Sequence, residues 1–574
     1  MTPPAGLRGR IAALLPRGSD WADARRSPGR DLVAGLTVAI VALPLALAFG
    51  VASGLGAQAG IATAVVAGTV AAVFGGSNLQ VSGPTGAMTV VLLPVVARFG
   101  ASGVLMVGAM AGIILVLLAV ARLGRYVRYL PMPVVEGFTA GIAVVIALQQ
   151  VPAALGVSGA TGDKVWQIAA DAVARFAGDP SAGSIGIALG VAAIMLVGAR
   201  VRPGWPFSLI AIAAATGLAQ ALPLGVHLLG TIPSGLPAPS LGFVDPATVT
   251  AMLPAALAIA ALAALESLLS ATVADGMSVN HTTDPERELF GQGLANLAAP
   301  VFGGVPATGA IARTAVNVRA GASSKAAAVV HAVVLAAIAL VAGPLVGLIP
   351  LAALAGVLFA TAVQMVESAS LLPIARSTRA DAAVLVLTFT VTVAVDLVTA
   401  VAVGVGVAVV LALRAVAASA SLDEVPLETG DHSAQERALL SEHIVAFRLD
   451  GPLVFAAAHR FLLELTDVAD VRVVILRMSR VSTMDATGAR VLGDAIRHLE
   501  RRGIVVLLSG VSAGHEDVLS ALGVADDLRR RGRLFAETPA AIEHARELVH
   551  RGEEAPPRVR PELRSGAPTP RAAG

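Results

Sequence analysis

The chain has 574 residues, of which 56% are hydrophobic and only 14% are charged, and its mean hydropathy is +0.79. A soluble domain carries about 25% charged residues, so this composition excludes an ordinary soluble protein and indicates a membrane protein. The formal net charge of +2 gives no support for nucleic-acid binding, and the zero cysteines exclude disulfides, thiol catalysis and cysteine metal sites.

Residues 1–29 form a basic arm ahead of the first apolar stretch. Its arginines, with one at the start of that stretch, are Arg8, Arg10, Arg17, Arg25, Arg26 and Arg30. The arm lacks a short apolar region with a small-residue cleavage site, so we expect no cleaved signal peptide. Because basic segments beside a first span stay on the cytoplasmic side, we expect a cytoplasmic N-terminus and a multi-pass protein of the plasma (inner) membrane.

Apolar stretches long enough to cross a bilayer recur from residue 32 to residue 415. At about 20 apolar residues each, they leave room for about twelve to fourteen spans, several of them interrupted by Gly or Pro. With fourteen crossings, the basic loops around Arg125, Arg200, Arg319 and Arg376 all lie on the cytoplasmic side. We therefore predict an all-α polytopic membrane domain over 30–418, embedded in the lipid bilayer.

Two segments of this domain resemble each other. QVSGPTGAMTVV (80–91) and GVPATGAIARTA (304–315) each contain a proline followed by Thr-Gly-Ala and a long aliphatic residue. In inverted-repeat transporters, interrupted segments at corresponding positions form half-helices that start near the bilayer midplane. We interpret the two segments as such a pair.

Two half-helices that begin face to face would bind an anion. A helix N-terminus exposes unpaired N–H groups and about half a positive charge. Pro84 and Pro306 suit a first helical turn, Gly86 and Gly309 leave the amides open, and Arg313 adds a full charge. The predicted anion-binding residues are Gly83, Pro84, Thr85, Gly86, Ala87, Met88, Ala307, Thr308, Gly309, Ala310, Ile311, Ala312 and Arg313.

Glu266 is the predicted intrinsic partner of Arg313. An arginine in mid-bilayer costs roughly 2.5 to 3.5 kcal/mol, whereas a Glu–Arg pair at about 4 Å and an effective dielectric near 20 gains about 4 kcal/mol. One interpretation is a structural ion pair. The other, which we favour, is that Glu266 takes up a proton as substrate binds, with Ser270 one turn later on the same face. Gln149 and Gln150 end a span, and we interpret them as interfacial.

After Arg414 the composition becomes polar. We predict a linker over 419–440, a small α/β domain over 441–552 and a disordered tail over 553–574. VRVVILRM and IVVLLSGV are expected to be strands, and ATGARVLGDAIRHLERRG a helix capped by Asp485.

The motifs together resemble the SulP family of anion transporters, the sulfate-permease-like solute carriers that end in a cytoplasmic STAS domain. They include DLVAGLTVAIVALPLALAFGVASG, VSGPTGAM, ALESLLSATVADGM, the run GQGLANLAAPVFGGVPATGAIARTAVNVRAGASS and STMDATGARVL. The resemblance implies fourteen spans in two inverted repeats of seven helices, a core domain that moves against a gate domain, and a homodimer.

The family's site, carried over by motif, falls on the two half-helices and on the first span. The residues of the first span are Ala42, Leu43, Pro44, Leu45 and Ala46. In sodium-dependent bicarbonate members, the residues matching Glu266 and Ser270 help to hold Na⁺ together with a threonine, where this chain has Ile311. The resemblance therefore favours a coupling proton over Na⁺, and the run ATGAIARTAVNVRAGA looks closer to the proton-coupled branch that moves dicarboxylates.

In the STAS-like domain, the residue that matches the phosphorylated position of related antagonists is Thr487. A capping role for this segment is the favoured interpretation. We expect the domain to contribute to trafficking, dimer contacts or regulation.

We therefore expect a secondary active transporter of a small anion, either a sulfate-like inorganic anion or a dicarboxylate, driven by proton symport and an elevator-like motion. The alternatives are a sodium-dependent bicarbonate transporter, an anion exchanger or an anion channel. An ATP-driven pump or other enzyme is not expected, because VRAGASSKAAA lacks the spacing of a phosphate-binding loop and H-E-x-x-H does not occur. No cofactor, metal or nucleic acid is expected.

Overall fold

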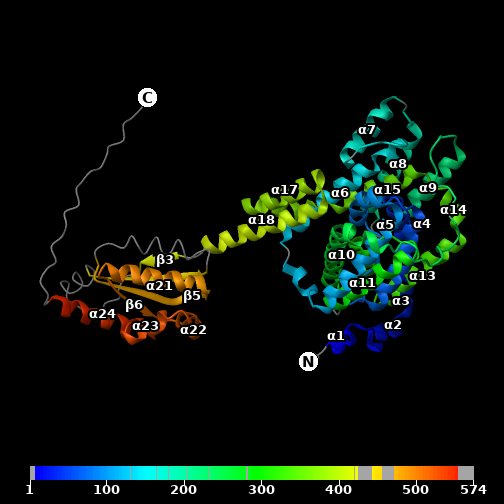
Figure 1. Ribbon diagram of the computed structural model, residues 1–574. Coiled ribbons are helices and arrows are strands. Elements are labelled where there is room, and N and C mark those ends of the chain that lie inside the picture. The colour runs from blue at the N-terminus through cyan, green and yellow to red at the C-terminus, as the bar shows by residue number, and fades with distance from the viewer. Residues whose placement is uncertain are drawn as a thin grey trace, which may run out of the picture. The chain divides into compact units, whose positions relative to one another are not determined.

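The computed structural model describes residues 7–129, 131–162, 164–178, 180–202, 205–231, 233–278, 282–366, 368–418, 421–424, 443–454 and 471–553. The chain divides into two compact units, Met1–Ala408 and Val409–Gly574. The first unit is helical, and the second contains a sheet with helices (Figure 1).

The helices of the first unit pack in two groups. The core group consists of α3 (Pro28–Ala52), α4 (Ala57–Phe74), α5 (Gly86–Val120), α10 (Val249–Met277), α11 (Pro285–Val301), α12 (Ile311–Arg319) and α13 (Ala326–Val341). The gate group consists of α6 (Met132–Leu155), α7 (Val165–Gly178), α8 (Ala182–Val201), α9 (Phe207–Ala221), α15 (Leu351–Met365), α16 (Ser368–Ser377) and α17 (Arg379–Ala394). The boundary between the two units falls within α18 (Leu397–Ala418). Contacts of α3 with α9 and α15, and of α5 with α6, join the groups.

Among the described residues, seven helices are long and apolar enough to cross a membrane. They are Pro28–Ala52, Ala57–Phe74, Gly86–Val120, Met132–Leu155, Ala182–Val201, Pro246–Met277 and Thr399–Val416. Shorter apolar helices add to these, and α5 contains two helical segments that meet at Gly100, whose φ of 69° is one that glycine tolerates. The predicted total of about fourteen spans stays a prediction.

Two short strands bring the related segments together. β1 (Ser82–Gly83) and β2 (Thr308–Gly309) pair in antiparallel fashion, with Ser82 opposite Gly309 and Gly83 opposite Thr308. Directly after them, α5 begins at Gly86 and α12 begins at Ile311. The antiparallel pairing is the arrangement that inverted repeats predict.

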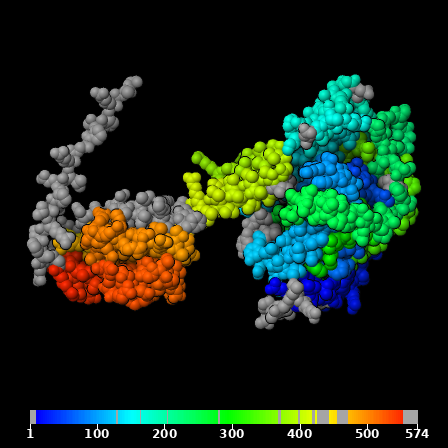
Figure 2. Space-filling view, in the orientation of Figure 1, coloured from blue at the N-terminus to red at the C-terminus, as the bar shows by residue number. Residues whose placement is uncertain are grey.

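The basic arm lies against the core group. It comprises α1 (Leu7–Leu14), η1 (Gly18–Trp21) and α2 (Ala22–Arg26), and α1 contacts α5 and α11. Asp20 forms an ion pair with Arg287 of α11, and the two side chains are only 12% and 9% exposed. Figure 2 shows the arm in dark blue on one side of the helical unit and α7 in cyan on the opposite side.

The second unit has a five-stranded sheet in the order β3-β4-β5-β6-β7. The strands are β3 (Ser421–Glu424), β4 (Ile444–Leu453), β5 (Val473–Met484), β6 (Val505–Ser509) and β7 (Leu534–Phe535). Only the β3–β4 pair is antiparallel. Helices α21 (Ala486–Arg501), α22 (Ala513–Ala521) and α23 (Val524–Arg530) pack on one face, and α24 (Thr538–Glu553) packs on the other.

The predicted strands and the first long helix of this unit are confirmed. Asp485 caps α21, because its Oδ1 accepts a hydrogen bond of 2.7 Å from the Gly488 N–H. Residues 421–424 differ from the prediction of a linker, since they pair with β4 and Leu422 packs on the core. Residues 425–440 of the predicted linker and 554–574 of the predicted tail lie outside the described residues.

Candidate anion-binding site

The start of α5 and the start of α12 meet at the β1–β2 crossing. Residues 83–88 and 307–310 are buried there, and Asn296 of α11 fixes the second segment. The Asn296 side chain donates to the Ala307 carbonyl and accepts from the Ala307 N–H, both at 2.8 Å. The backbone before α12 is therefore held in place without being part of a helix.

The two prolines do not occupy first helical turns. Pro84 precedes the first residue of α5, and Pro306 precedes β2 and the first residue of α12. The interpretation of a proline in each first turn was wrong, because the residues after each proline first enter a strand or an extended cap. Thr85 and Ala310 are these caps, and both have extended backbone angles.

Arg313 is the third residue of α12, as expected, and its side chain turns back toward the crossing. The residue is 2% exposed. Its Nη2 donates to the Pro84 carbonyl at 2.7 Å, and its buried Nη1 has no hydrogen-bond partner among the residues that the structure describes. A buried cation with a single neutral acceptor retains much of its capacity to bind an anion.

Glu266 does not form the predicted direct ion pair with Arg313. Its Oε2 accepts a hydrogen bond of 2.9 Å from the Thr85 hydroxyl, and no contact within 4.0 Å joins the two charged groups. The physical reason is that Thr85 engages Glu266 and the neighbouring Pro84 carbonyl engages Arg313. Glu266 and Arg313 thus contact two adjacent residues, Glu266 through the Thr85 side chain and Arg313 through the Pro84 carbonyl.

Ser270 of α10 forms its hydrogen bond with α12. Its hydroxyl donates to the Thr314 hydroxyl at 2.9 Å, and Thr314 in turn accepts from the Val81 N–H at 3.1 Å. Ser270 therefore joins α10 to α12 and to the approach to β1.

Several polar residues of the site were missed from the sequence. The Ser267 hydroxyl accepts from the Gly309 N–H at 3.0 Å and lies 3.0 Å from the Thr308 hydroxyl. Gln292 of α11 donates to the Ser82 hydroxyl at 2.6 Å. With Asn296, these residues hold β1 and β2, and their polarity within apolar helices was the signal that could have identified them.

The predicted segment of the first span, 42–46, lies within α3 and is buried. α3 packs against α12, so the segment lies on an element that contacts the second half-helix. Pro44 interrupts the helical hydrogen bonding at this level, because proline has no N–H.

The first turn of α12 is open although the residues around it are buried. Ile311 is 40% exposed and Ala312 is also exposed, whereas Ala310 and Arg313 are buried. The beginning of this half-helix therefore lies at a surface of the helical unit, next to the buried residues of the crossing.

Position 83 requires glycine because the Arg313 guanidinium lies close to its backbone. A Cβ atom at this position would lie 2.6 Å from Arg313 Nη1. The missing side chain leaves room for the guanidinium beside the crossing.

Thr487, the candidate phosphorylation residue, is exposed in the first turn of α21. Within the described part of the chain, no group of three or more His, Cys, Asp or Glu side chains could hold a metal ion.

The sulfate permease family model matches residues 29–388, and the STAS domain model matches 438–541. The chain belongs to the sulfate permease family. Members of this family are membrane transporters of anions, which are not enzymes.

Individual relatives support the assignment of this chain to the sulfate permease family. It is 34% identical over 506 residues to the putative sulfate transporter YvdB of Bacillus subtilis (strain 168), covering 86% of this chain and 94% of the relative. The solved transmembrane domain of a cyanobacterium bicarbonate transporter, BicA, is 31% identical and has a TM-score of 0.57, covering 67% of this chain and 98% of that domain.

The structure of SLC26A9 is similar in fold. Its TM-score is 0.81 with 17% sequence identity, and the match covers 96% of this chain and 95% of the other. The fold expectation of a helical membrane part followed by a STAS domain is confirmed.

Proposed function

We propose that this protein is a secondary active transporter that moves a sulfate-like inorganic anion or a dicarboxylate across the plasma membrane with a coupling proton. The observation that carries the proposal is the β1–β2 crossing, from which two helices begin beside one buried guanidinium. Arg313 Nη1 has no partner and the first turn of α12 is accessible, so an anion that reaches this turn gains a charged donor.

The packing of the helices supports an elevator-like motion. The core group contains both half-helices, Glu266 and Arg313. Its main contacts with the gate group are made by two helices, α3 and α5. A body that carries the whole site can slide against the gate group without breaking the site.

The contacts of Glu266 support a coupling proton. With Glu266 ionised, the Thr85 hydroxyl donates to it and the acid adds a negative charge near the site. Protonation removes this charge, which favours an incoming anion beside Arg313. Binding of the anion and binding of the proton thus promote each other.

Sodium coupling has less support in the structure. The Ser270 hydroxyl donates to Thr314, and position 311 carries the apolar side chain Ile311. Of the residues that the resemblance links to Na⁺, only Glu266 offers a carboxylate oxygen here, whereas Na⁺ would need several oxygen ligands.

The decisive experiment is anion uptake into proteoliposomes with Arg313→Ala. Loss of the guanidinium is expected to lower uptake of sulfate, bicarbonate or fumarate by about a hundredfold or more, the equivalent of roughly 2.7 kcal/mol. Arg319→Ala is the matched control, because Arg319 ends the same helix and is exposed. Equal uptake by both variants would overturn the site.

Coupling is tested with Glu266→Gln under imposed pH and Na⁺ gradients. We expect the unaltered protein to respond to the pH gradient and the variant to lose that response while it still exchanges anion. A response to the Na⁺ gradient would support the bicarbonate alternative, and large uncoupled single-channel currents would support an anion channel.

Orientation and assembly are part of the same proposal. We propose that the arm and the STAS domain are cytoplasmic, that the protein is a homodimer, and that the STAS domain regulates transport, with Thr487 as a phosphorylation candidate. Protease accessibility in sealed vesicles and crosslinking in native membranes test orientation and assembly.

A further inference from the structure

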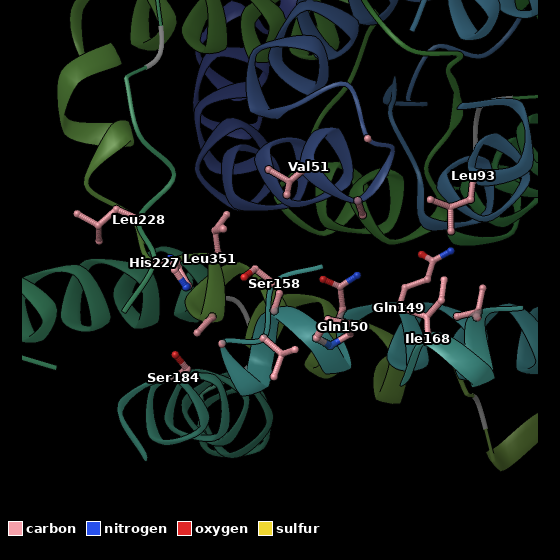
Figure 3. Close-up of a pocket in the computed structure, with 18 residues that line it drawn as sticks. Val51, Leu93, Gln149, Gln150, Ser158, Ile168, Ser184, His227, Leu228 and Leu351 are labelled. Carbon is pink, nitrogen blue, oxygen red and sulfur yellow. The ribbon is translucent and has the colours of Figure 1, made fainter. Parts of the chain in front are cut away.

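A cavity lies between the core and gate groups, away from the half-helix crossing. It encloses about 540 Å³, and we call it the outer cavity. Its lining includes Val51 at the end of α3 and Leu93 of α5 on one side, and residues of α6, α7, α8 and α15 on the other (Figure 3). Since α3 starts next to the basic arm and Val51 is near its far end, the cavity lies at the end of the unit opposite to the arm.

Two buried polar side chains line this cavity and have unused hydrogen-bonding capacity. Gln150 is 7% exposed, and no hydrogen bond of its amide is found among the described residues. Ser184 is 2% exposed, and its hydroxyl oxygen accepts from Ser181, which leaves its own proton free to be donated. Gly156 keeps that hydroxyl open, because a Cβ there would lie 2.5 Å from Ser184 Oγ. The interpretation of Gln150 as interfacial does not account for its burial.

The helix ends around the cavity favour an anion. Ser184 lies in the first turn of α8, and Val165 and Ala352 lie in the first turns of α7 and α15, so three helix N-termini reach the lining. The C-termini of α3 and α6 also reach it, but the carbonyls of Val51 and Ala153 accept hydrogen bonds from the turns that follow. The lining contains no carboxylate, and His227 adds a further polar group.

We propose that the outer cavity is a second anion site, in which the Gln150 amide and the Ser184 hydroxyl are two separate donors that a small oxyanion contacts in turn before it reaches the half-helix crossing. The proposal rests on the proposed transport of anions. Because the donors are neutral, the site binds weakly and releases readily, which suits a place of passage. It shares no lining residue with the predicted anion-binding residues.

Binding is tested apart from transport by the fluorescence of Trp166, which is 48% exposed and follows the lining residue Val165 directly. The full-length protein carries Trp21→Phe and Trp205→Phe, so that Trp166 is the remaining one of its three tryptophans. Arg313→Ala is added to disable the crossing. Titration with sulfate, bicarbonate and fumarate is expected to give a saturable change with at least one anion.

Gln150→Leu and Ser184→Ala are each expected to weaken this binding about tenfold or more. Ser208→Ala is the matched control, because Ser208 is also a buried serine near a helix start but does not line the cavity. No saturable change in the Arg313→Ala protein, or a change that Gln150→Leu leaves intact, would overturn the outer site. Failure of the proposed function would instead appear as absent uptake by the unaltered protein, whatever Trp166 reports.

Discussion

Two buried arginines of the core group, Arg287 and Arg313, are accommodated in different ways. Both terminal nitrogens of Arg287 contact the Asp20 carboxylate, with Nη1–Oδ1 at 3.3 Å and Nη2–Oδ2 at 2.5 Å. Arg313 has one neutral acceptor, the Pro84 carbonyl, and a free Nη1. A carboxylate thus neutralises Arg287, although its buried Nε has no hydrogen-bond partner among the described residues. Arg313 has no such anionic contact and therefore has capacity left for an anion.

The largest expected effect is a loss of stability when the Arg287 side chain is removed. Arg287→Ala leaves the half-buried Asp20 carboxylate without its charged partner and is expected to lower the stability of the protein by about 2 to 3 kcal/mol. Thermal unfolding in detergent, followed by size-exclusion chromatography, measures this loss. Asp23→Ala is the control, since its ion pair with Arg26 is exposed and contributes about 0 to 1 kcal/mol. A melting temperature unchanged in Arg287→Ala would contradict the comparison.

A charge-conserving change at Arg313 tests whether anion binding needs the shape of the guanidinium as well as its charge. Arg313→Lys keeps the positive charge but loses the planar fork that can hold Pro84 and an anion together. We expect anion uptake at low concentration to fall by about thirtyfold, the equivalent of roughly 2 kcal/mol, with the melting temperature retained. Wild-type uptake by this variant would mean that charge alone is sufficient.

A smaller effect is expected when the guanidinium is displaced and not removed. Gly83→Ala places a Cβ within 2.6 Å of Arg313 Nη1, so the side chain must shift. The KM for anion is expected to rise about tenfold, or roughly 1.4 kcal/mol. Gly190→Ala in α8 serves as the control, because a Cβ there meets nothing within 4 Å. Similar KM values for the two variants would argue against a role for the position of Arg313.

The smallest effect is a pH dependence of stability. Burial alone would raise the pKa of Asp20, but hydrogen bonds from Arg287 and from the Arg17 N–H outweigh it, and the pKa lies below its usual 3.8. The stabilisation from this lowered pKa is therefore complete above pH 3.8 and is lost as the pH falls through the lowered value. Asp20→Asn should show a shallower loss of thermal stability in this acid range than the unaltered protein, and parallel curves would refute the assignment.

Local patterns were sufficient to find the two half-helix segments, the place of Arg313 in its helix and the Asp485 cap. Each of these depends on residues that are neighbours in the chain. Glycine, proline and polar residues in a long apolar run interrupt helices at positions that can be read directly.

The contacts of the site could not be found in this way. A direct Glu266–Arg313 pair was the simplest electrostatic solution, yet Thr85 and the Pro84 carbonyl provide closer partners. This result depends on the path of the backbone between β1 and α5, which local sequence patterns do not give. The hydrogen bonds of Asn296 to Ala307 depend in the same way on the path of the backbone before β2.

The ion pair between Asp20 and Arg287 fastens the arm to α11, an element of the proposed moving body. A fluorescent dye on the arm would therefore travel with that body and report its displacement in real time. Since the chain has no native cysteine, one introduced in place of the exposed Ala22 would label uniquely, which makes the arm a convenient handle for single-molecule distance measurements.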